Sequence, residues 1–327
     1  MCTCVAWKTG DHYFGRNLDL EYRFGEKVVI TPRGYRFPLR NGQELRTYHA
    51  MIGMASVVSD YPLYAEATNE KGLSMAGLYF PDNACYFREG QKGLNLASFE
   101  LIPYFLGRYA SVAEVREVLK ELTITDVSFS PELPATQLHW MIGDGRECIV
   151  MEQTKEGLKV YDNPVEILTN NPPFPYHLEN VNNYMGLTPC WQENRFAASL
   201  DLRPYGNGMG AIGLPGDASP ASRFVRAAFN RWNAVPGGDE MESVSQFFHI
   251  LDSVAMVKGA VVTKDGKNDF TVYSCCMNAS RGIYYYKTYS NSQITAVRMT
   301  EGAMSGGALT VYELREEQQV AYEAEGF

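Results

Sequence analysis

Two segments at the start of the chain decide the fold: Met1-Cys2-Thr3-Cys4-Val5-Ala6-Trp7 and Tyr13-Phe14-Gly15-Arg16-Asn17-Leu18-Asp19. Both have the length and composition of short strands. The apolar stretch at residues 5–7 is followed at once by Lys8, so the segment lacks the long apolar region of a signal peptide. We therefore expect a cytoplasmic protein with reduced cysteines.

Outward from this start, blocks of strands alternate with blocks of helices. Apolar runs predict strands at residues 28–31, 51–58, 73–80, 137–142, 147–153, 158–161, 165–169, 260–263, 270–276, 283–288, 294–299 and 309–314. Helices are expected at residues 95–106, after the capping box of Ser111 and Glu114, at 220–232 and at 243–254. Residues 185–218 are rich in Gly and Pro and form a long excursion. This order predicts stacked sheets with helical layers outside them.

Composition excludes several classes of protein. The 327 residues are 45% hydrophobic and carry a formal net charge of −9, without a basic run or 18 consecutive apolar residues. We therefore expect neither a nucleic-acid partner nor a membrane association. Seven cysteines without a CxxC pair and five histidines without HxxxH spacing predict no disulfide framework and no metal site.

A match to the dinucleotide fingerprint GxGxxG at residues 208–213 lacks the structural context of that motif. No strand precedes it, and Pro215 blocks the helix whose N-terminus would receive a pyrophosphate. We expect a loop there, either flexible or used in subunit contacts, and no cofactor.

Cys2 is the residue with the clearest chemical potential. Once an initiator methionine is removed, its thiol and a free α-amine lie on one residue. An ordinary α-amine has a pKa of about 7.7–8.0 and accepts a proton near neutral pH. Nucleophile and base then need no second side chain, as in N-terminal nucleophile enzymes. A papain-like pairing of a cysteine with one of the five histidines is the alternative, but the sequence does not select a histidine.

The two opening segments and several later blocks resemble the choloylglycine hydrolase family, which contains conjugated bile salt hydrolases and penicillin V acylases. The later blocks are Thr31-Pro32-Arg33-Gly34-Tyr35, Asn69-Glu70-Lys71-Gly72-Leu73, Met75-Ala76-Gly77-Leu78, Leu168-Thr169-Asn170-Asn171-Pro172, Gly213-Leu214-Pro215-Gly216-Asp217, Ser222-Arg223-Phe224, Tyr284-Tyr285-Tyr286-Lys287-Thr288-Tyr289 and Gln293-Ile294-Thr295. The resemblance implies a single α+β domain over residues 1–327, with the four-layer αββα sandwich of N-terminal nucleophile hydrolases. It also implies a cofactor-free amidase, a homotetramer, and subunit contacts through residues 185–218.

The family's catalytic roles map onto polar residues of the quoted blocks. Cys2 would attack the amide carbonyl and use its own α-amine to move the proton. Arg16 would favour the thiolate, and Asp19 would orient the amine. Asn170 would donate its side-chain amide to the oxyanion, although the adjacent Asn171 differs by one register only. Arg223 lies near the start of the helix at 220–232, where a cation opposes the helix dipole, which favours a role in the site.

Tyr79 occupies the family's second oxyanion position, where the backbone N–H is the donor. Bile salt hydrolases usually carry Asn there and penicillin V acylases usually carry Tyr. The remainder of the chain resembles bile salt hydrolases more closely, so we expect a bile salt hydrolase, with a penicillin V acylase as the alternative and a non-catalytic carrier of apolar ligands as a third. The substrate pocket should be apolar, and the expected substrate-binding residues are Leu18, Leu20, Tyr22, Phe24, Val58, Tyr61 and Leu133.

Overall fold

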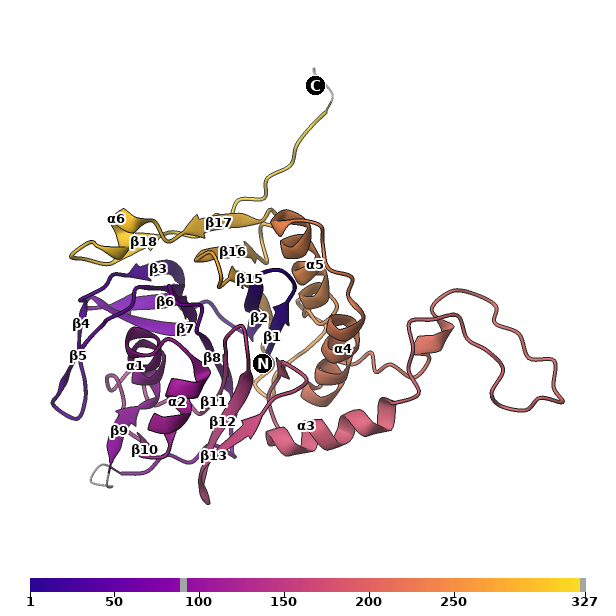
Figure 1. The fold of residues 1–327 in the computed structure, drawn as a ribbon, viewed down its shortest axis with the longest axis horizontal. Helices are drawn as coiled ribbons and strands as arrows, with labels where there is room; N and C mark the ends of the chain where they lie inside the picture. The colour runs from indigo at the N-terminus through magenta and orange to yellow at the C-terminus, as the bar shows by residue number, and fades with distance from the viewer. Residues whose placement is uncertain (89–92, 324–327) are drawn as a thin grey trace.

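The computed structural model describes residues 1–88 and 93–323, which form two stacked β-sheets between two layers of helices. In Figure 1 the layers run from α1 (Leu101–Arg108) and α2 (Val112–Leu119), through the two sheets, to α4 (Pro220–Asn233) and α5 (Glu240–Asp252). The two large sheets are antiparallel throughout the strand pairs described. The predicted αββα sandwich is confirmed.

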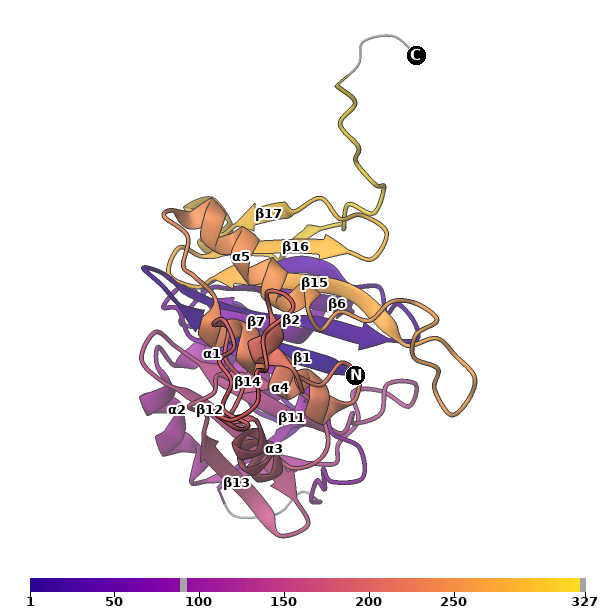
Figure 2. The ribbon, with the colours of Figure 1, turned by 90° about the vertical axis from the view of Figure 1, so that its right-hand side faces the viewer.

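The six-stranded sheet contains the N-terminal strand, second from one edge. Its order is β14 (Ile167–Leu168), β1 (Cys2–Lys8), β2 (His12–Leu20), β15 (Phe270–Asn278), β16 (Ile283–Thr288) and β17 (Thr295–Arg298). Figure 2 shows α4 and α5 crossing the outer face of this sheet. Gly15 lets β2 approach β15 closely, because a Cβ atom there would lie 2.0 Å from the carbonyl oxygen of Cys275.

The eight-stranded sheet is buried on both faces, which explains its long apolar runs. Its order is β13 (Gly157–Asp162), β12 (Cys148–Thr154), β11 (Leu138–Gly143), β8 (Ser74–Tyr79), β7 (Tyr61–Asn69), β6 (Met51–Val58), β3 (Lys27–Thr31) and β18 (Thr310–Tyr312). Successive residues alternate between two cores: Val28 and Ile30 pack toward the other sheet, whereas Val29 packs with the helices α1 and α2. Hydrophobic residues therefore occupy most positions of the central strands, whereas the edge strands β13 and β18 are partly exposed.

Smaller elements complete the fold and border its helical layers. Two short sheets pair β4 (Arg36–Pro38) with β5 (Glu44–Arg46), and β9 (Leu94–Ala97) with β10 (Leu122–Thr125). The remaining helical elements are η1 (Ser98–Glu100), α3 (Phe174–Val181), η2 (Asn182–Tyr184), η3 (Met209–Ala211) and α6 (Glu301–Met304). Within residues 1–88 and 93–323, every helix is too short or too polar to span a bilayer.

Two of the element predictions are wrong, and a third is only partly correct. The segment at 95–106 does not start as a helix, because Leu94–Ala97 pairs in parallel with Leu122–Thr125, and the α-helix begins only at Leu101. Pro103 then lies in the first turn, where a missing N–H costs nothing. Residues 260–263 form isolated bridges instead of a strand, and the strand expected at 165–169 is confined to Ile167–Leu168.

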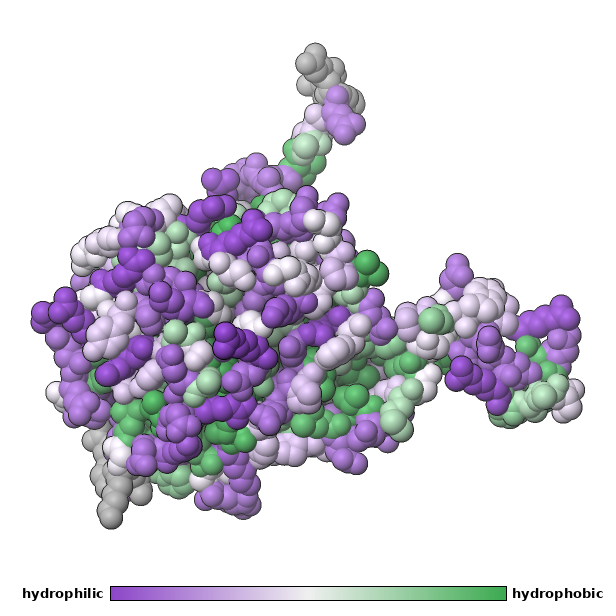
Figure 3. Space-filling view, viewed as in Figure 1, coloured by the Kyte–Doolittle hydropathy of each residue, from purple (hydrophilic) through white to green (hydrophobic). Residues whose placement is uncertain are grey.

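The excursion at residues 185–218 extends away from the sandwich as a long arm between α3 and α4 (Figure 1). Apart from the short η3, it contains no helix or strand. Figure 3 shows hydrophobic (green) residues on the surface of this arm. The exposed large apolar side chains between residues 185 and 218 are Met185, Trp191, Phe196, Leu200, Leu202, Tyr205 and Ile212.

Candidate active site

Cys2 is the first residue of β1, and the β1–β2 hairpin brings the second opening segment beside it. Cys2 pairs with Leu18, and Cys4 pairs with Arg16. Because directly paired residues of an antiparallel ladder point to one face, Cys2, Arg16 and Leu18 share a face, which is turned toward the eight-stranded sheet. Asn17 and Asp19 point to the opposite face, under α4 and α5. The functional cluster therefore surrounds β2 from both faces.

Arg16 is buried between the sheets beside Cys2. Its Nη1 donates to the carbonyl oxygens of Gly77 (2.6 Å) and Ala65 (3.4 Å), and it lies 3.7 Å from Glu66 Oε2. Its Nε has no hydrogen-bond partner among the described residues. Burial by itself lowers the pKa of Arg16, but attraction to Cys2, Tyr273 and Glu66 outweighs burial and raises that pKa. The side chain is therefore a permanent positive charge held next to the thiol.

A β-bulge creates the space that Arg16 enters. Met54 pairs with Glu66 and Ala55 pairs with Tyr64, so Ala65 is the extra residue of β7. Beyond this point β7 separates from β8, because their pairing covers only Glu66 to Thr68. The carbonyl groups exposed at the separation are those that accept from Arg16.

Asn170 lies against the backbone of Cys2, and three contacts fix its amide. The N–H of Cys2 and Nη2 of Arg223 both donate to Oδ1, each at 2.8 Å. Its Nδ2 donates to the carbonyl oxygen of Tyr79 at 2.7 Å. The neighbouring Asn171 instead donates to the carbonyl oxygen of Pro81. The structure therefore brings Asn170, and not Asn171, to Cys2.

Two histidines hold the main chain on both sides of the Asn170 side chain. His139, on β11, lies 2.9 Å from the Thr169 carbonyl oxygen through Nε2 and 3.0 Å from Glu152 through Nδ1. His177, on α3, lies 2.9 Å from the carbonyl oxygen of Asn170. Burial lowers the pKa of His177 to about 4, so its ring is neutral and donates through Nε2. No sequence spacing signalled these contacts, because the partners are backbone oxygens.

Arg223 connects α4 to the start of β1. Besides Asn170, it donates through Nη1 to the carbonyl oxygen of Cys2 and to Thr3 Oγ1, and through Nε to the Ala218 carbonyl oxygen. Burial lowers the pKa of Arg223. The Ser219 side chain caps the helix, so Arg223 is not needed for helix stability and is free to make these contacts.

Tyr79 ends β8, and the pairing with β11 decides where its backbone points. The N–H of Phe80 donates to the carbonyl oxygen of Gln137 at 2.9 Å. In an antiparallel ladder such bonds alternate, so the N–H and C=O of Tyr79 are turned away from β11. The carbonyl indeed accepts from Asn170, and the N–H faces the same side. The Tyr79 side chain is 44% exposed.

Two carboxylates lie near the N-terminus: Asp19 on the helix-facing side of β2, and Asp269 in the loop before β15. Asp19 is buried and accepts from Thr271 through Oδ1 (2.6 Å), while its Oδ2 has no partner among the described residues. The Met1 ammonium donates to the carbonyl oxygen of Asp19 (2.5 Å) and to Asp269 Oδ2 (3.3 Å). Burial raises the pKa of Asp19, and Arg223 opposes this rise. Asp269 was not predicted, and its position in the loop before β15 offered no motif.

A cavity of about 500 Å³ opens beside Cys2 and Arg16. Four predicted binding residues line it: Leu18, Leu20, Tyr22 and Phe24. The cavity is also lined by residues that were not predicted: Met1, Glu21, Tyr64, Ala65, Gly77, Thr136, Leu138, Thr263 and Asp269. Its lining is mainly apolar, as an aryl or steroid acyl group requires. In residues 1–88 and 93–323, no cluster of three or more His, Cys, Asp or Glu could hold a metal ion.

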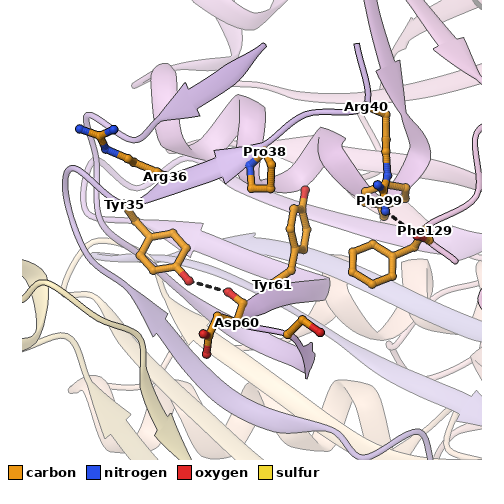
Figure 4. Close-up of a pocket in the computed structure, with 9 residues that line it drawn as sticks. Tyr35, Arg36, Pro38, Arg40, Asp60, Tyr61, Phe99 and Phe129 are labelled. Carbon is orange, nitrogen blue, oxygen red and sulfur yellow. Dashed lines mark hydrogen bonds between the residues drawn. The ribbon is translucent and has the colours of Figure 1, made fainter. Parts of the chain in front are cut away.

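The three other predicted binding residues lie outside this cavity. Tyr61 lines a separate cavity of about 250 Å³ (Figure 4), where its ring packs edge-on against Phe99 and Phe129. Val58 pairs with Tyr61 at the end of β6, and Leu133 is 41% exposed on a turn. A contact of these three with substrate stays a prediction.

Comparison with known proteins agrees with this geometry. The family model for linear amide C–N hydrolases, choloylglycine hydrolase family, matches residues 2–312. A bile salt hydrolase/transferase from Lactiplantibacillus plantarum is 46% identical over 319 residues, which is 98% of each chain. A second one, from Clostridium perfringens, is 42% identical over 317 residues, covering 95% of this chain and 96% of that protein.

Solved structures agree as well. The C2A mutant of conjugated bile acid hydrolase from Clostridium perfringens superposes with a TM-score of 0.92 at 40% identity, covering 99% of this chain and all of the other. Penicillin V acylase from Agrobacterium tumefaciens shares the fold, with a TM-score of 0.75 at 18% identity over 95% and 90% of the two chains. The resemblance noted in the sequence is thus confirmed, and the chain belongs to the choloylglycine hydrolase family of linear amide C–N hydrolases.

Proposed function

We propose that this protein hydrolyses the amide bond of glycine- or taurine-conjugated bile acids, with Cys2 as the nucleophile after removal of Met1. The observation that carries the proposal is the convergence of Arg16 and Asn170 on Cys2 at the wall of a mainly apolar cavity. The relatives that are 38–46% identical over nearly the whole chain are bile salt or conjugated bile acid hydrolases.

The proposed mechanism begins with the nitrogen of Cys2. Once Met1 is removed, this nitrogen becomes an α-amine that remains within reach of Asn170 Oδ1 and accepts the thiol proton. The positive charge of Arg16 stabilises the thiolate, which attacks the amide carbon. The free Oδ2 of Asp19, buried beside the N-terminus, accepts a hydrogen bond from the amine and orients it.

The oxyanion then receives two donors. The backbone N–H of Tyr79 faces the site, and Nδ2 of Asn170 uses one of its two hydrogens on the Tyr79 carbonyl and keeps the other. The protonated amine gives its proton to the amide nitrogen, and the C–N bond breaks. Glycine or taurine departs, and the bile acid acyl group remains bound to Cys2 as a thioester. The amine next activates a water molecule, and hydrolysis of the thioester regenerates the thiol.

Turnover assays test the proposal on protein that lacks Met1 by intact mass. We expect kcat/KM for glycocholate or taurocholate to exceed that for penicillin V by at least tenfold, about 1.4 kcal/mol. We expect Cys2→Ala to abolish turnover. An active Cys2→Ala protein, or ligand binding without turnover in the wild-type protein, would contradict the proposal. Penicillin V acylase activity is the second candidate, because the Tyr79 side chain lines the cavity.

We also propose that the arm at residues 185–218 joins subunits of a homotetramer in the cytoplasm. Its exposed apolar side chains, such as Phe196 (84% exposed) and Tyr205 (89% exposed), are costly in water and suited to burial against another copy. Sedimentation analysis should give four chains for the wild-type protein and fewer for the double variant Phe196→Ser, Tyr205→Ser. A monomeric wild-type protein would contradict this assignment.

A further inference from the structure

A buried carboxylate that no sequence motif indicated lies directly behind Arg16. Glu66 is in the middle of β7, flanked by Ala65 and Ala67, and its side chain is wholly buried between the two sheets. The bulge at Ala65 changes the register of β7, so that Glu66 points toward the six-stranded sheet.

The neighbours of Glu66 come from three other strands and all present donors to it. Tyr273 Oη donates to Oε2 (2.8 Å), and Tyr284 Oη donates to Oε1 (2.6 Å). Cys275 Sγ lies 3.6 Å from Oε1, and Arg16 Nη1 lies 3.7 Å from Oε2. Three hydrogen-bond donors and one positive charge around a carboxyl group favour its ionised form. Burial raises the pKa of Glu66, and Arg16 and the two tyrosine hydroxyls oppose that rise.

Glu66 affects the electrostatic field of Arg16 and does not determine the position of the Arg16 side chain. Arg16 keeps its position through the carbonyl oxygens of Gly77 and Ala65, which do not depend on the Glu66 charge. Glu66 instead cancels part of the field that Arg16 exerts on nearby thiols. Burial is the main cause that raises the pKa of the neighbouring Cys4; the charge of Arg16 lowers that pKa, and the charge of Glu66 raises it.

We propose that Glu66 is a positioning residue of the catalytic machinery, whose negative charge, held by Tyr273 and Tyr284, sets how strongly Arg16 favours the Cys2 thiolate. The proposal rests on the proposed role of Cys2 as nucleophile. Too strong a field would yield a thiolate of low basicity, which is a weaker nucleophile and a poor partner for proton exchange with the α-amine. The Arg16–Glu66 pair moderates that field.

The other charged groups near Cys2 are Asp19 and Arg223, on the helix-facing side of β2, and Glu21 and Asp269, which line the cavity. Among the described residues, no hydrogen bond or ion pair joins any of these four to Glu66. A change of charge at Glu66 therefore reaches Cys2 through the space between the sheets, without altering the contacts on the other face of β2.

The experiment measures alkylation of Cys2 by iodoacetamide against pH, in full-length protein shown by intact mass to lack Met1. Mass spectrometry of the N-terminal peptide separates Cys2 from Cys190, which is exposed. We expect Glu66→Gln to move the midpoint of the pH–rate curve about one unit toward lower pH, and to reduce plateau kcat/KM about threefold. Arg16→Gln should move the midpoint in the opposite direction. An unchanged midpoint in Glu66→Gln, or a shift to higher pH, would overturn the proposal.

Matched variants separate the charge of Glu66 from its structural contribution. Glu66→Asp retains the charge and should leave the midpoint near the wild-type value. Glu100→Gln makes the same change at a buried carboxylate that bonds to Ala97 and Arg40 on the α1 side, and should also leave it unchanged. If Glu66→Gln does not fold, Tyr284→Phe removes one donor to the carboxylate and should give a smaller shift in the same direction.

Alkylation reports on the thiol even without turnover, so the experiment distinguishes this proposal from the proposed function. An active Cys2→Ala protein would remove the nucleophile assignment whatever Glu66 does. Loss of turnover in Cys2→Ala, with no midpoint shift in Glu66→Gln, would overturn the role of Glu66 alone.

Discussion

The two faces of β2 each hold a buried arginine, and the two arginines differ in what surrounds them. Arg16, between the sheets, has Glu66 behind it and the thiol beside it, and attraction to these groups raises its pKa. Arg223, on α4, donates to the neutral oxygens of Cys2, Thr3, Asn170 and Ala218, and burial lowers its pKa. The first side chain supplies charge, whereas the second supplies a rigid hydrogen-bonding fork. The same residue type therefore stabilises charge on one face of β2 and holds neighbouring groups in position by hydrogen bonds on the other face.

The largest expected effect comes from the amide that Arg223 holds in place. Asn170→Ala removes the acceptor of the Cys2 nitrogen and the proposed oxyanion donor, so we expect kcat to fall by about 10²–10³-fold, with the fold retained. Steady-state kinetics with glycocholate measure the loss. The matched control is Asn171→Ala, whose amide bonds to Pro81. Equal losses in both variants would contradict the assignment of Asn170.

Lysine at each arginine position sharpens the comparison of the two faces. Arg223→Lys cannot bridge the Cys2 carbonyl, Thr3 and Asn170 at once, so we expect kcat/KM to fall on the order of 100-fold. Arg16→Lys keeps a positive charge near the thiol, and we expect a loss of about tenfold. Turnover and circular dichroism are measured on both variants. A larger loss of kcat/KM in Arg16→Lys than in Arg223→Lys would contradict the conclusion that Arg16 acts through its charge and Arg223 through its hydrogen-bonding geometry.

Acid sensitivity tests the support of Asn170 by His177. Burial lowers the pKa of His177 from 6.5 to about 4, so between these values the unfolded chain binds the proton more tightly than the folded one. The contribution of neutral His177 to the free energy of unfolding is therefore fully present above pH 6.5 and is lost as the pH falls toward 4. The free energy of unfolding is measured with urea at pH 7 and pH 4.5. We expect its decrease between these two pH values to be about 1–3 kcal/mol smaller in His177→Gln than in the wild-type protein.

His12 supplies the control for that measurement. Burial lowers its pKa to about 4 as well, but it lies at the far end of β2 from Cys2. His12→Gln should reduce the acid sensitivity without changing turnover at pH 7, whereas His177→Gln should change both. Identical turnover in the two variants would show that His177 does not position Asn170.

The smallest expected effect comes from Tyr79, which ends β8 and lines the cavity on the Arg16 side of β2. Its backbone N–H is the proposed donor, and any residue except proline retains it. Tyr79→Asn should therefore keep kcat near the wild-type value and raise the preference for glycocholate over penicillin V by less than about tenfold. The test compares kcat/KM for glycocholate and for penicillin V in Tyr79→Asn and in the wild-type protein. A loss of turnover above tenfold would indicate that the side chain itself takes part in the reaction.

The quoted sequence blocks predicted much of the site because they contain residues that act through their own side chains. Cys2, Arg16 and Asn170 come together as expected, and four of the seven predicted binding residues line the cavity. The sequence left Asn170 and Asn171 one register apart, and only the packing of α3 and α4 against β1 separates them. Tyr61 was expected on a segment bordering the pocket, and its ring lines a separate cavity, so its contact with substrate stays a prediction.

By itself, the sequence predicted stacked sheets with outer helices, because blocks of strands alternate with blocks of helices along the chain. Its resemblance to the choloylglycine hydrolase family added the αββα sandwich and the proposed role of Cys2, whose α-amine can act as its own base once Met1 is removed. Only the tertiary structure decided that Glu66 stands behind Arg16. The reason is physical: a bulge at Ala65 changes which face of β7 carries the carboxylate, and partners from β2, β15 and β16 meet it across the two sheets. A buried charge is stable only with such partners, and strand pairing across more than 200 residues brings them together.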